Sequence, residues 1–216
     1  MAEKTKKLTP KRMAIFSAIV SLVAFLYKFG LGIISYSIIL MVASISTLLV
    51  FICKVIFVRN MESTRDKKKR AYFFMLVLAL SFGILFLLFS VLKVGGIEIK
   101  KTNNFDGWLA YLFIAFVILM FLLSIIKLRG ALGKDDIMVI GLKEMTFVSA
   151  LADAVIIEEF LYRVLISYIV DAINFPILSQ VVYYTNSYFP LLTAIFMICV
   201  PAIFMFKRFR HYEVEA

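Results

Sequence analysis

Long apolar runs constrain this chain more than any other feature of its sequence. Six of them follow one another, at about residues 13–30, 33–58, 71–94, 108–128, 137–168 and 188–206. Each is near or above the ~20 residues that a helix needs to cross ~30 Å of hydrocarbon. The runs are apolar on all sides, whereas a helix of a soluble domain has one apolar face. We therefore predict an all-α fold, a polytopic membrane helix bundle of about six transmembrane helices.

Composition agrees with this fold class. Of the 216 residues, 63% are hydrophobic, and the mean hydropathy is +0.98. A soluble domain is usually a little under half apolar. The predicted organisation is a basic cytoplasmic tail at 1–12, a six-span membrane domain at 13–206 and a second cytoplasmic tail at 207–216. There is no glycine-rich phosphate loop, so nucleotide binding is not expected.

Basic residues predict the orientation of the bundle. The net charge is +10, and Lys and Arg stand between the apolar runs. Nineteen of them are assigned to one side, and Lys28, Lys93, Lys100 and Lys101 to the other. Short cytoplasmic loops retain Lys and Arg, so both termini are predicted to be cytoplasmic, in the cell membrane of a bacterium. This spread between runs does not form the basic face or stripe of a nucleic-acid-binding protein.

The densest basic cluster and the sparse metal-binding side chains complete the charge analysis. The cluster consists of Arg65, Lys67, Lys68, Lys69 and Arg70. Such a cluster beside a membrane span is typical of a contact with anionic lipid. The two cysteines, Cys53 and Cys199, lie within apolar runs and read as small hydrophobic residues. We therefore predict no metal site and no cofactor.

The fifth run carries charge where lipid would penalise it. A candidate intramembrane polar site comprises Thr146, Ser149, Asp153, Glu158, Glu159 and Arg163. An ionisable group at the bilayer centre costs roughly 2.5–3.5 kcal/mol on insertion scales, so these side chains should face protein or water. Lys143 and Glu144, near the start of the run, are expected to reach the cytoplasmic interface.

Helical spacing sorts these side chains. Thr146, Ser149 and Asp153 lie along one stripe, at spacings of three and four. Glu159 and Arg163 are four apart and are predicted to form an ion pair. Two interpretations remain open. Either the Glu159–Arg163 pair is structural and Glu158 reaches the outer interface, or Asp153 and Glu158 line a path for an ion or a solute.

Residues 158–163 read Glu-Glu-Phe-Leu-Tyr-Arg. This hexapeptide resembles the EExxxR signature of the CAAX-type intramembrane prenyl proteases and their bacteriocin-immunity relatives. The resemblance implies that the glutamates, with later histidines, activate a water. The chain departs from that pattern, because its single histidine, His211, lies in the C-terminal tail. A hydrolytic site therefore cannot be assembled in the family's way.

The first hairpin has a basic tail, an apolar run that contains Lys28, then Gly32 and the segment 37–40, Ser-Ile-Ile-Leu. Together with six spans and internal termini, this pattern is similar to the start of cation diffusion facilitator transporters. The resemblance implies a transporter-like bundle with metal ligands on the second and fifth helices.

The ligand positions depart from that family. Its second-helix ligands align with Ala43, Ser46 and Val50, which do not bind zinc well. On the fifth helix Asp153 has no histidine four residues away. The chain thus resembles a ligand-poor relative of these transporters.

Three functions follow from these patterns. The first is a non-enzymatic, transporter-like bundle for a small solute or ion. The second is an accessory subunit that binds another membrane protein, a second copy of itself or anionic lipid. The third is an intramembrane protease, which the missing histidines oppose.

Overall fold

The computed structural model describes residues 10–34, 37–95, 136–165 and 176–214, together with 115, 118–119 and 121–126. In these parts of the chain the secondary structure is helical and contains no strand, which confirms the all-α class. The long helices are α1 (Pro10–Ile34), α2 (Ile38–Asn60), α3 (Arg65–Val94), α5 (Ile137–Leu165) and α7 (Pro176–Val214).

Several helices extend beyond their apolar runs. The glycine-containing link predicted at residues 30–32 is helical, because α1 continues to Ile34. Helix α2 begins after Ser37, whose hydroxyl accepts from the Leu40 amide at 3.3 Å. Helix α3 includes the basic cluster in its first turns, and α7 begins at Pro176 instead of residue 188. The length of an apolar run indicates only the part of a helix that lies in hydrocarbon. The helix itself can continue into polar surroundings, because its backbone hydrogen bonds form there too.

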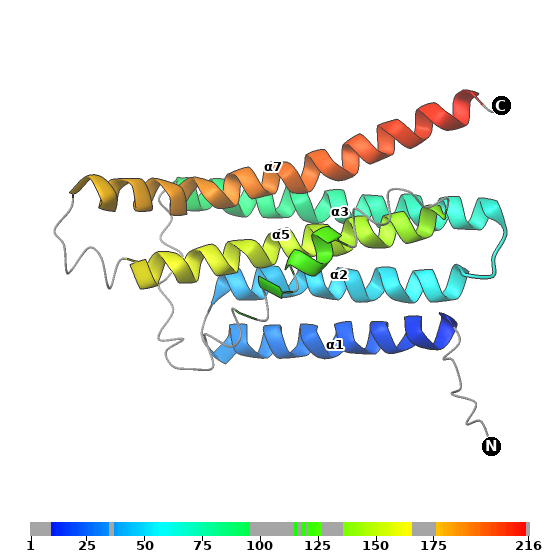
Figure 1. Ribbon diagram of the computed structural model, residues 1–216, viewed down its shortest axis with the longest axis horizontal. Coiled ribbons are helices and arrows are strands. Elements are labelled where there is room, and N and C mark those ends of the chain that lie inside the picture. The colour runs from blue at the N-terminus through cyan, green and yellow to red at the C-terminus, as the bar shows by residue number, and fades with distance from the viewer. Residues whose placement is uncertain are drawn as a thin grey trace, which may run out of the picture.

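Helix α5 lies at the centre of the bundle. It packs against α2, α3 and α7, while α1 packs along α2 and α3 packs along α7. In Figure 1 helices α1, α3 and α5 run in one direction, and α2 and α7 run in the other. The start of α1 and the end of α7 therefore lie at the same end of the bundle.

Among the described residues, four helices are long and apolar enough to cross a membrane. They cover Lys11–Ile34, Ile38–Asn60, Arg65–Val94 and Tyr183–Phe206. Helix α5 is not one of the four, because charged residues interrupt its apolar sequence. Its neighbours shield it on several sides, as expected for a charged helix in a bundle. Most of the predicted fourth span, 108–128, lies outside the described residues.

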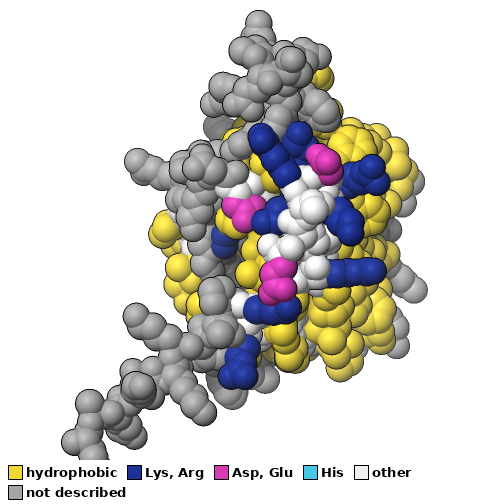
Figure 2. Space-filling model, turned by 90° about the vertical axis from the view of Figure 1, so that its right-hand side faces the viewer, with side chains coloured by type: hydrophobic (Ala, Val, Ile, Leu, Met, Phe, Trp, Pro, Cys, Tyr) yellow, Lys and Arg dark blue, Asp and Glu magenta, His cyan; other side chains and the backbone are white. Residues whose placement is uncertain are grey.

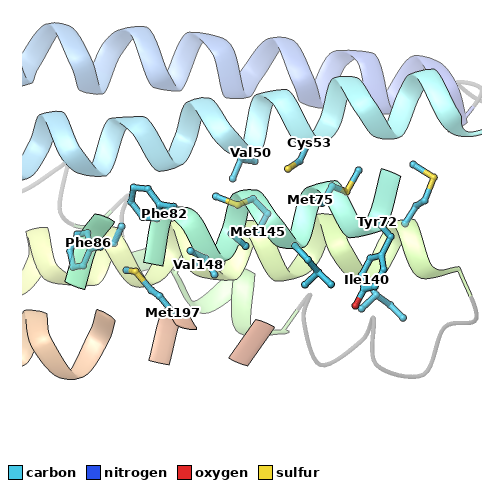
Figure 3. Close-up of a cluster of buried hydrophobic side chains, with 14 of the residues drawn as sticks. Val50, Cys53, Tyr72, Met75, Phe82, Phe86, Ile140, Met145, Val148 and Met197 are labelled. Carbon is cyan, nitrogen blue, oxygen red and sulfur yellow. The ribbon is translucent and has the colours of Figure 1, made fainter. Parts of the chain in front are cut away.

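The interior is filled by apolar side chains from four helices. Figure 3 shows a cluster that includes Val50, Cys53, Tyr72, Met75, Phe82, Phe86, Ile140, Met145, Val148 and Met197. Cys53 is fully buried there as a small hydrophobic side chain. The outward faces are also apolar, with exposed side chains such as Phe16, Phe73 and Leu88. Apolar residues on both sides of a helix suit a bundle surrounded by lipid.

Helix α7 contains two prolines in its interior, Pro190 and Pro201. A proline removes one backbone donor and its ring disturbs the preceding turn. The helix changes direction along its length in Figure 1. Membrane helices tolerate such bends where neighbouring helices pack against them.

Helices α3 and α7 approach each other closely at Gly83. A Cβ atom built there would lie 2.9 Å from Ile198 Cγ1 and 3.3 Å from the Met197 carbonyl oxygen. Small residues permit such close contacts between membrane helices. A Cβ built at Gly30, in contrast, would meet nothing within 4 Å.

We expect Gly83→Val to lower the free energy of unfolding by about 1–3 kcal/mol, because the added methyl groups must displace the α7 backbone. The measurement is unfolding in mixed micelles by titration with a denaturing detergent. Gly30→Val is the matched control and should change stability by about 0.5 kcal/mol or less. Equal losses in both variants would contradict the close α3–α7 contact.

Candidate functional site

The polar side chains of α5 form two groups on different faces of the helix. Ser149 and Asp153 are four residues apart, so they share one face, which is turned toward α1 and α2. Glu158 follows Asp153 by five residues and is rotated by about 140° from it. It lies beside α7, and the adjacent Glu159 contacts both α3 and α7.

Asp153 forms a buried ion pair with Lys28. The Lys28 Nζ atom donates to both carboxylate oxygens, at 2.6 and 2.7 Å, and also to the Thr47 hydroxyl at 3.2 Å. Lys28 is 6% exposed and Asp153 7%. Because the three residues belong to α1, α2 and α5, this pair joins three helices around one charge.

Lys28, which charge counting assigned to the outer side, lies within α1 and is buried. Helix α1 continues to Ile34, which places Lys28 more than one turn inside the helix. A buried ammonium group requires a carboxylate partner, and Asp153 is near enough to supply one. The only hint of this pair in the sequence is that one lone cation and one lone anion occur in separate apolar runs. Helical spacing predicts contacts within one helix, so it could not predict a contact between α1 and α5.

The Ser149 hydroxyl contacts Ser46 of α2 at 2.9 Å. Because Ser46 donates its own proton to the Ala43 carbonyl, Ser149 is the donor in this contact. Ser46 is one of the positions aligned with transporter metal ligands, and here its side chain joins α2 to α5. Thr146 donates to the carbonyl of Leu142 within its own helix. Thus Ser149 and Asp153 of the predicted stripe make contacts across helices.

The second group joins α3, α5 and α7, and we call it the acidic junction: Lys93, Glu158, Glu159 and Asn186. Lys93 Nζ donates to Glu159 Oε2 at 2.8 Å. The Asn186 amide donates to both Glu158 oxygens, at 3.2 and 3.3 Å, and to Glu159 Oε2 at 3.2 Å. Two carboxylates, one ammonium group and one amide therefore meet where three helices pack together.

Two members of the acidic junction were not predicted. Lys93 was assigned to the outer side, but its side chain is only 17% exposed in the pair with Glu159. Asn186 lies in a stretch predicted to be outside the membrane, and the early start of α7 brings it beside α5. The predicted Glu159–Arg163 pair stays a prediction, because the Arg163 side chain lies outside the described residues.

Two further charged residues lie deeper than predicted. Lys54, one of the nineteen basic residues assigned to the cytoplasmic side, belongs to α2 and is half-buried. Its ammonium group donates to the Ser21 hydroxyl at 2.6 Å and to the Ser17 carbonyl at 3.0 Å. Glu144 was expected at the interface but is 1% exposed. Neighbouring helices cover both side chains, and the length of an apolar run cannot predict such coverage.

The two groups differ in the chemistry that they permit. Both oxygens of Asp153 accept from the Lys28 ammonium group, so this carboxylate joins α5 to α1. Glu158 is hydrogen-bonded to a neutral amide in the described part of the chain. Within that part, no group of three or more His, Cys, Asp or Glu side chains is placed to hold a metal ion. The acidic junction is therefore suited to binding a proton or a polar solute.

The predicted lipid-binding cluster occupies the first turns of α3, at the end of the bundle where α1 also begins. Figure 2 views this end and shows Lys and Arg side chains gathered over it, with apolar side chains around them. This end is separated from the acidic junction by most of the length of α3.

The buried ion pair gives a prediction for stability. We expect Asp153→Leu to lower the free energy of unfolding by about 3–5 kcal/mol, because Lys28 is left as an uncompensated buried charge. The double variant Lys28→Met/Asp153→Leu should recover most of that loss, since both charges are gone. Detergent-induced unfolding measures all variants.

The exposed Lys11–Glu62 pair, at 3.2 Å, supplies the control. Lys11→Met/Glu62→Leu and each single variant should change stability by about 1 kcal/mol or less. A double variant at residues 28 and 153 that is no more stable than Asp153→Leu would show that the pair is not the source of the loss.

Comparisons of this chain with models of protein families, with curated proteins and with solved structures find no match. A function is therefore inferred from the two polar groups of α5 and from the end of the bundle where the basic residues of α3, Arg65–Arg70, lie; we call this end the basic end.

Proposed function

We propose that the chain is a six-span membrane protein with both termini in the cytoplasm, and that it moves a proton or a small polar solute across the membrane through the acidic junction. The observation that carries this proposal is the contact of Asn186 with both Glu158 and Glu159. Carboxylates inside a membrane bundle are typical of ion pathways and proton relays. No enzymatic step is needed for this function.

Three features support the topology. The four apolar helices, α5 and the predicted span at 108–128 make six crossings. Helix α1 begins and α7 ends at the same end of the bundle, as an even number of crossings requires. Most of the basic residues whose side chains are described gather at that end, which favours a cytoplasmic location in the cell membrane of a bacterium.

Glu158 is better suited to exchange a proton than Asp153. Protonation of Asp153 would leave the Lys28 ammonium group buried without a counter-charge, which is costly. Glu158 has no such ion pair among the described side chains: its hydrogen-bond partner there is the neutral Asn186 amide, and the nearby Lys93 is bound by Glu159. The neighbouring Glu159 is held by Lys93, so its negative charge is already balanced. The acidic junction therefore contains one carboxylate that can gain and lose a proton without breaking an ion pair.

Helix α7 offers a way for this exchange to change the structure. Pro190 has no N–H to donate to the carbonyl four residues earlier, which belongs to Asn186. The backbone is thus weakened at the residue that contacts the two glutamates. A change in the charge of Glu158 alters what Asn186 binds, and α7 can then bend at this level.

We expect Glu158→Gln to reduce proton flux to the background level, because glutamine cannot carry a proton. The protein is reconstituted in proteoliposomes that contain a pH-sensitive dye, and flux is driven by a potassium diffusion potential. Glu62→Gln, at the exposed end of the bundle, is the matched control and should retain wild-type flux. Flux in Glu158→Gln equal to that of the wild type would exclude this carboxylate.

The proposed orientation has its own test. In a Cys53→Ala/Cys199→Ala background, Asn103→Cys should react with a membrane-impermeant maleimide on intact cells. Glu62→Cys should react only after the cells are permeabilised. The reverse pattern of labelling would contradict the cytoplasmic location of the basic end.

The position of the Asn186 amide also favours a second candidate function, that of an intramembrane protease. In the CAAX-type proteases that residues 158–163 resemble, histidines from later helices would join the glutamates, and here Asn186 reaches them from a later helix. An amide can orient a water but cannot accept its proton, so a carboxylate would be the base. This function predicts cleavage of a prenylated peptide that Glu158→Ala abolishes. Absence of cleavage by the folded wild type would exclude it.

A further inference from the structure

The end of the bundle where α1 and α3 begin carries an excess of positive charge. Its described basic residues are Lys11, Arg12, Arg59, Arg65, Lys67, Lys68, Lys69 and Arg70. Its described acidic residues are Glu62, Asp66 and Asp136. These residues belong to the basic end. Figure 2 shows Lys and Arg side chains (dark blue) and a few Asp and Glu side chains (magenta) over this end, bordered by apolar side chains (yellow).

The length of α3 places its basic residues at the level of lipid headgroups. The helix has 30 residues, which correspond to about 45 Å. The hydrocarbon core is only ~30 Å thick, and the apolar part of α3 begins at Ala71. The six residues before it, Arg65–Arg70, add about 9 Å and extend out of the hydrocarbon. In a bilayer whose core holds the apolar part of α3, these charges would lie at the level of the phosphates.

Neighbouring helices end at the same level. Lys11 of α1 contacts Glu62 in the α2–α3 turn at 3.2 Å, which aligns the start of α1 with that turn. The Ser63 amide donates to the Asn60 carbonyl at 3.1 Å and closes the turn directly after α2. Lys and Arg from three helices therefore surround one short turn, and they form a surface instead of a single projecting helix.

Two of the acidic residues at this end have partners of their own. Glu62 accepts from Lys11, and the Asp136 carboxylate accepts from the Met138 amide at 3.0 Å, where it caps α5. Lys67 and Arg70, by contrast, are exposed. Eight basic residues against three acidic ones leave this surface with a large positive excess among the described side chains.

We propose that the basic end binds the headgroups of anionic phospholipids in the membrane leaflet that it faces. Lys and Arg near such a leaflet gain affinity from its negative surface potential, and their charges attract phosphates within a Debye length. A nucleic acid is a poorer fit, because the apolar border in Figure 2 keeps the charged surface beside the leaflet. This inference does not depend on the transport of a proton or solute.

The test measures binding of phosphatidylglycerol and phosphatidylcholine to the purified full chain in detergent by native mass spectrometry. We expect phosphatidylglycerol to bind more tightly, and its binding to weaken as salt is raised. In Lys67→Gln/Lys68→Gln the apparent Kd for phosphatidylglycerol should rise about tenfold or more, since each cation contributes on the order of fivefold. Binding of phosphatidylcholine should not change.

Lys100→Gln/Lys101→Gln is the matched control, because it removes the same two charges just beyond the opposite end of α3. It should bind phosphatidylglycerol as the wild type does, and both variants should show wild-type melting temperatures. Equal affinity for the two lipids, or equal losses in the two variants, would overturn the proposal. Displacement of the lipid by an equimolar short RNA or by inorganic phosphate would also overturn it.

Discussion

The buried ion pair between Lys28 and Asp153 is the interaction on which the rest of the bundle depends. A charge taken out of water is expensive unless an opposite charge and further hydrogen bonds compensate it. Asp153 supplies the charge, and Thr47 supplies the additional hydrogen bond. Helix α1 packs along α2, and Lys28 extends its contacts to α5. The rotation of α5 about its axis is thereby fixed, and Glu158 and Glu159 are turned toward α3 and α7.

Apolar run lengths predicted the class of fold and the approximate place of each long helix, because the hydrophobic thickness of a bilayer sets the length of a span. They did not predict where the helices end, because polar residues continue a helix beyond the hydrocarbon. The helical period correctly predicted that Ser149 and Asp153 share a face. It could not identify Lys28, Lys93 or Asn186 as partners, since these contacts depend on how separate helices pack. Six crossings and their orientation remain predictions.

Each polar group of α5 contains at least one carboxylate and an ammonium group, but the two differ in how they respond to a change of charge. In the first, each oxygen of Asp153 is bound by an ammonium group, so any change of charge opposes folding. In the second, an amide divides its hydrogen bonds between two carboxylates, and a proton can be added while the Lys93–Glu159 pair remains. Helix α5 thus carries both an ion pair that fixes it to α1 and a carboxylate, Glu158, whose charge can change.

The distance in sequence between Lys28 and Asp153 has a consequence for how the protein is made. The ribosome delivers Lys28 to the membrane 125 residues before Asp153, the carboxylate that neutralises it. During that interval the early hairpin must hold a lone ammonium group, at a cost of roughly 2.5–3.5 kcal/mol if it sits centrally. Lys28 lies near the end of α1 and has a long apolar stem, so it can reach toward water while it waits. Arrival of α5 then supplies the counter-charge, and the first hairpin can close onto this later helix.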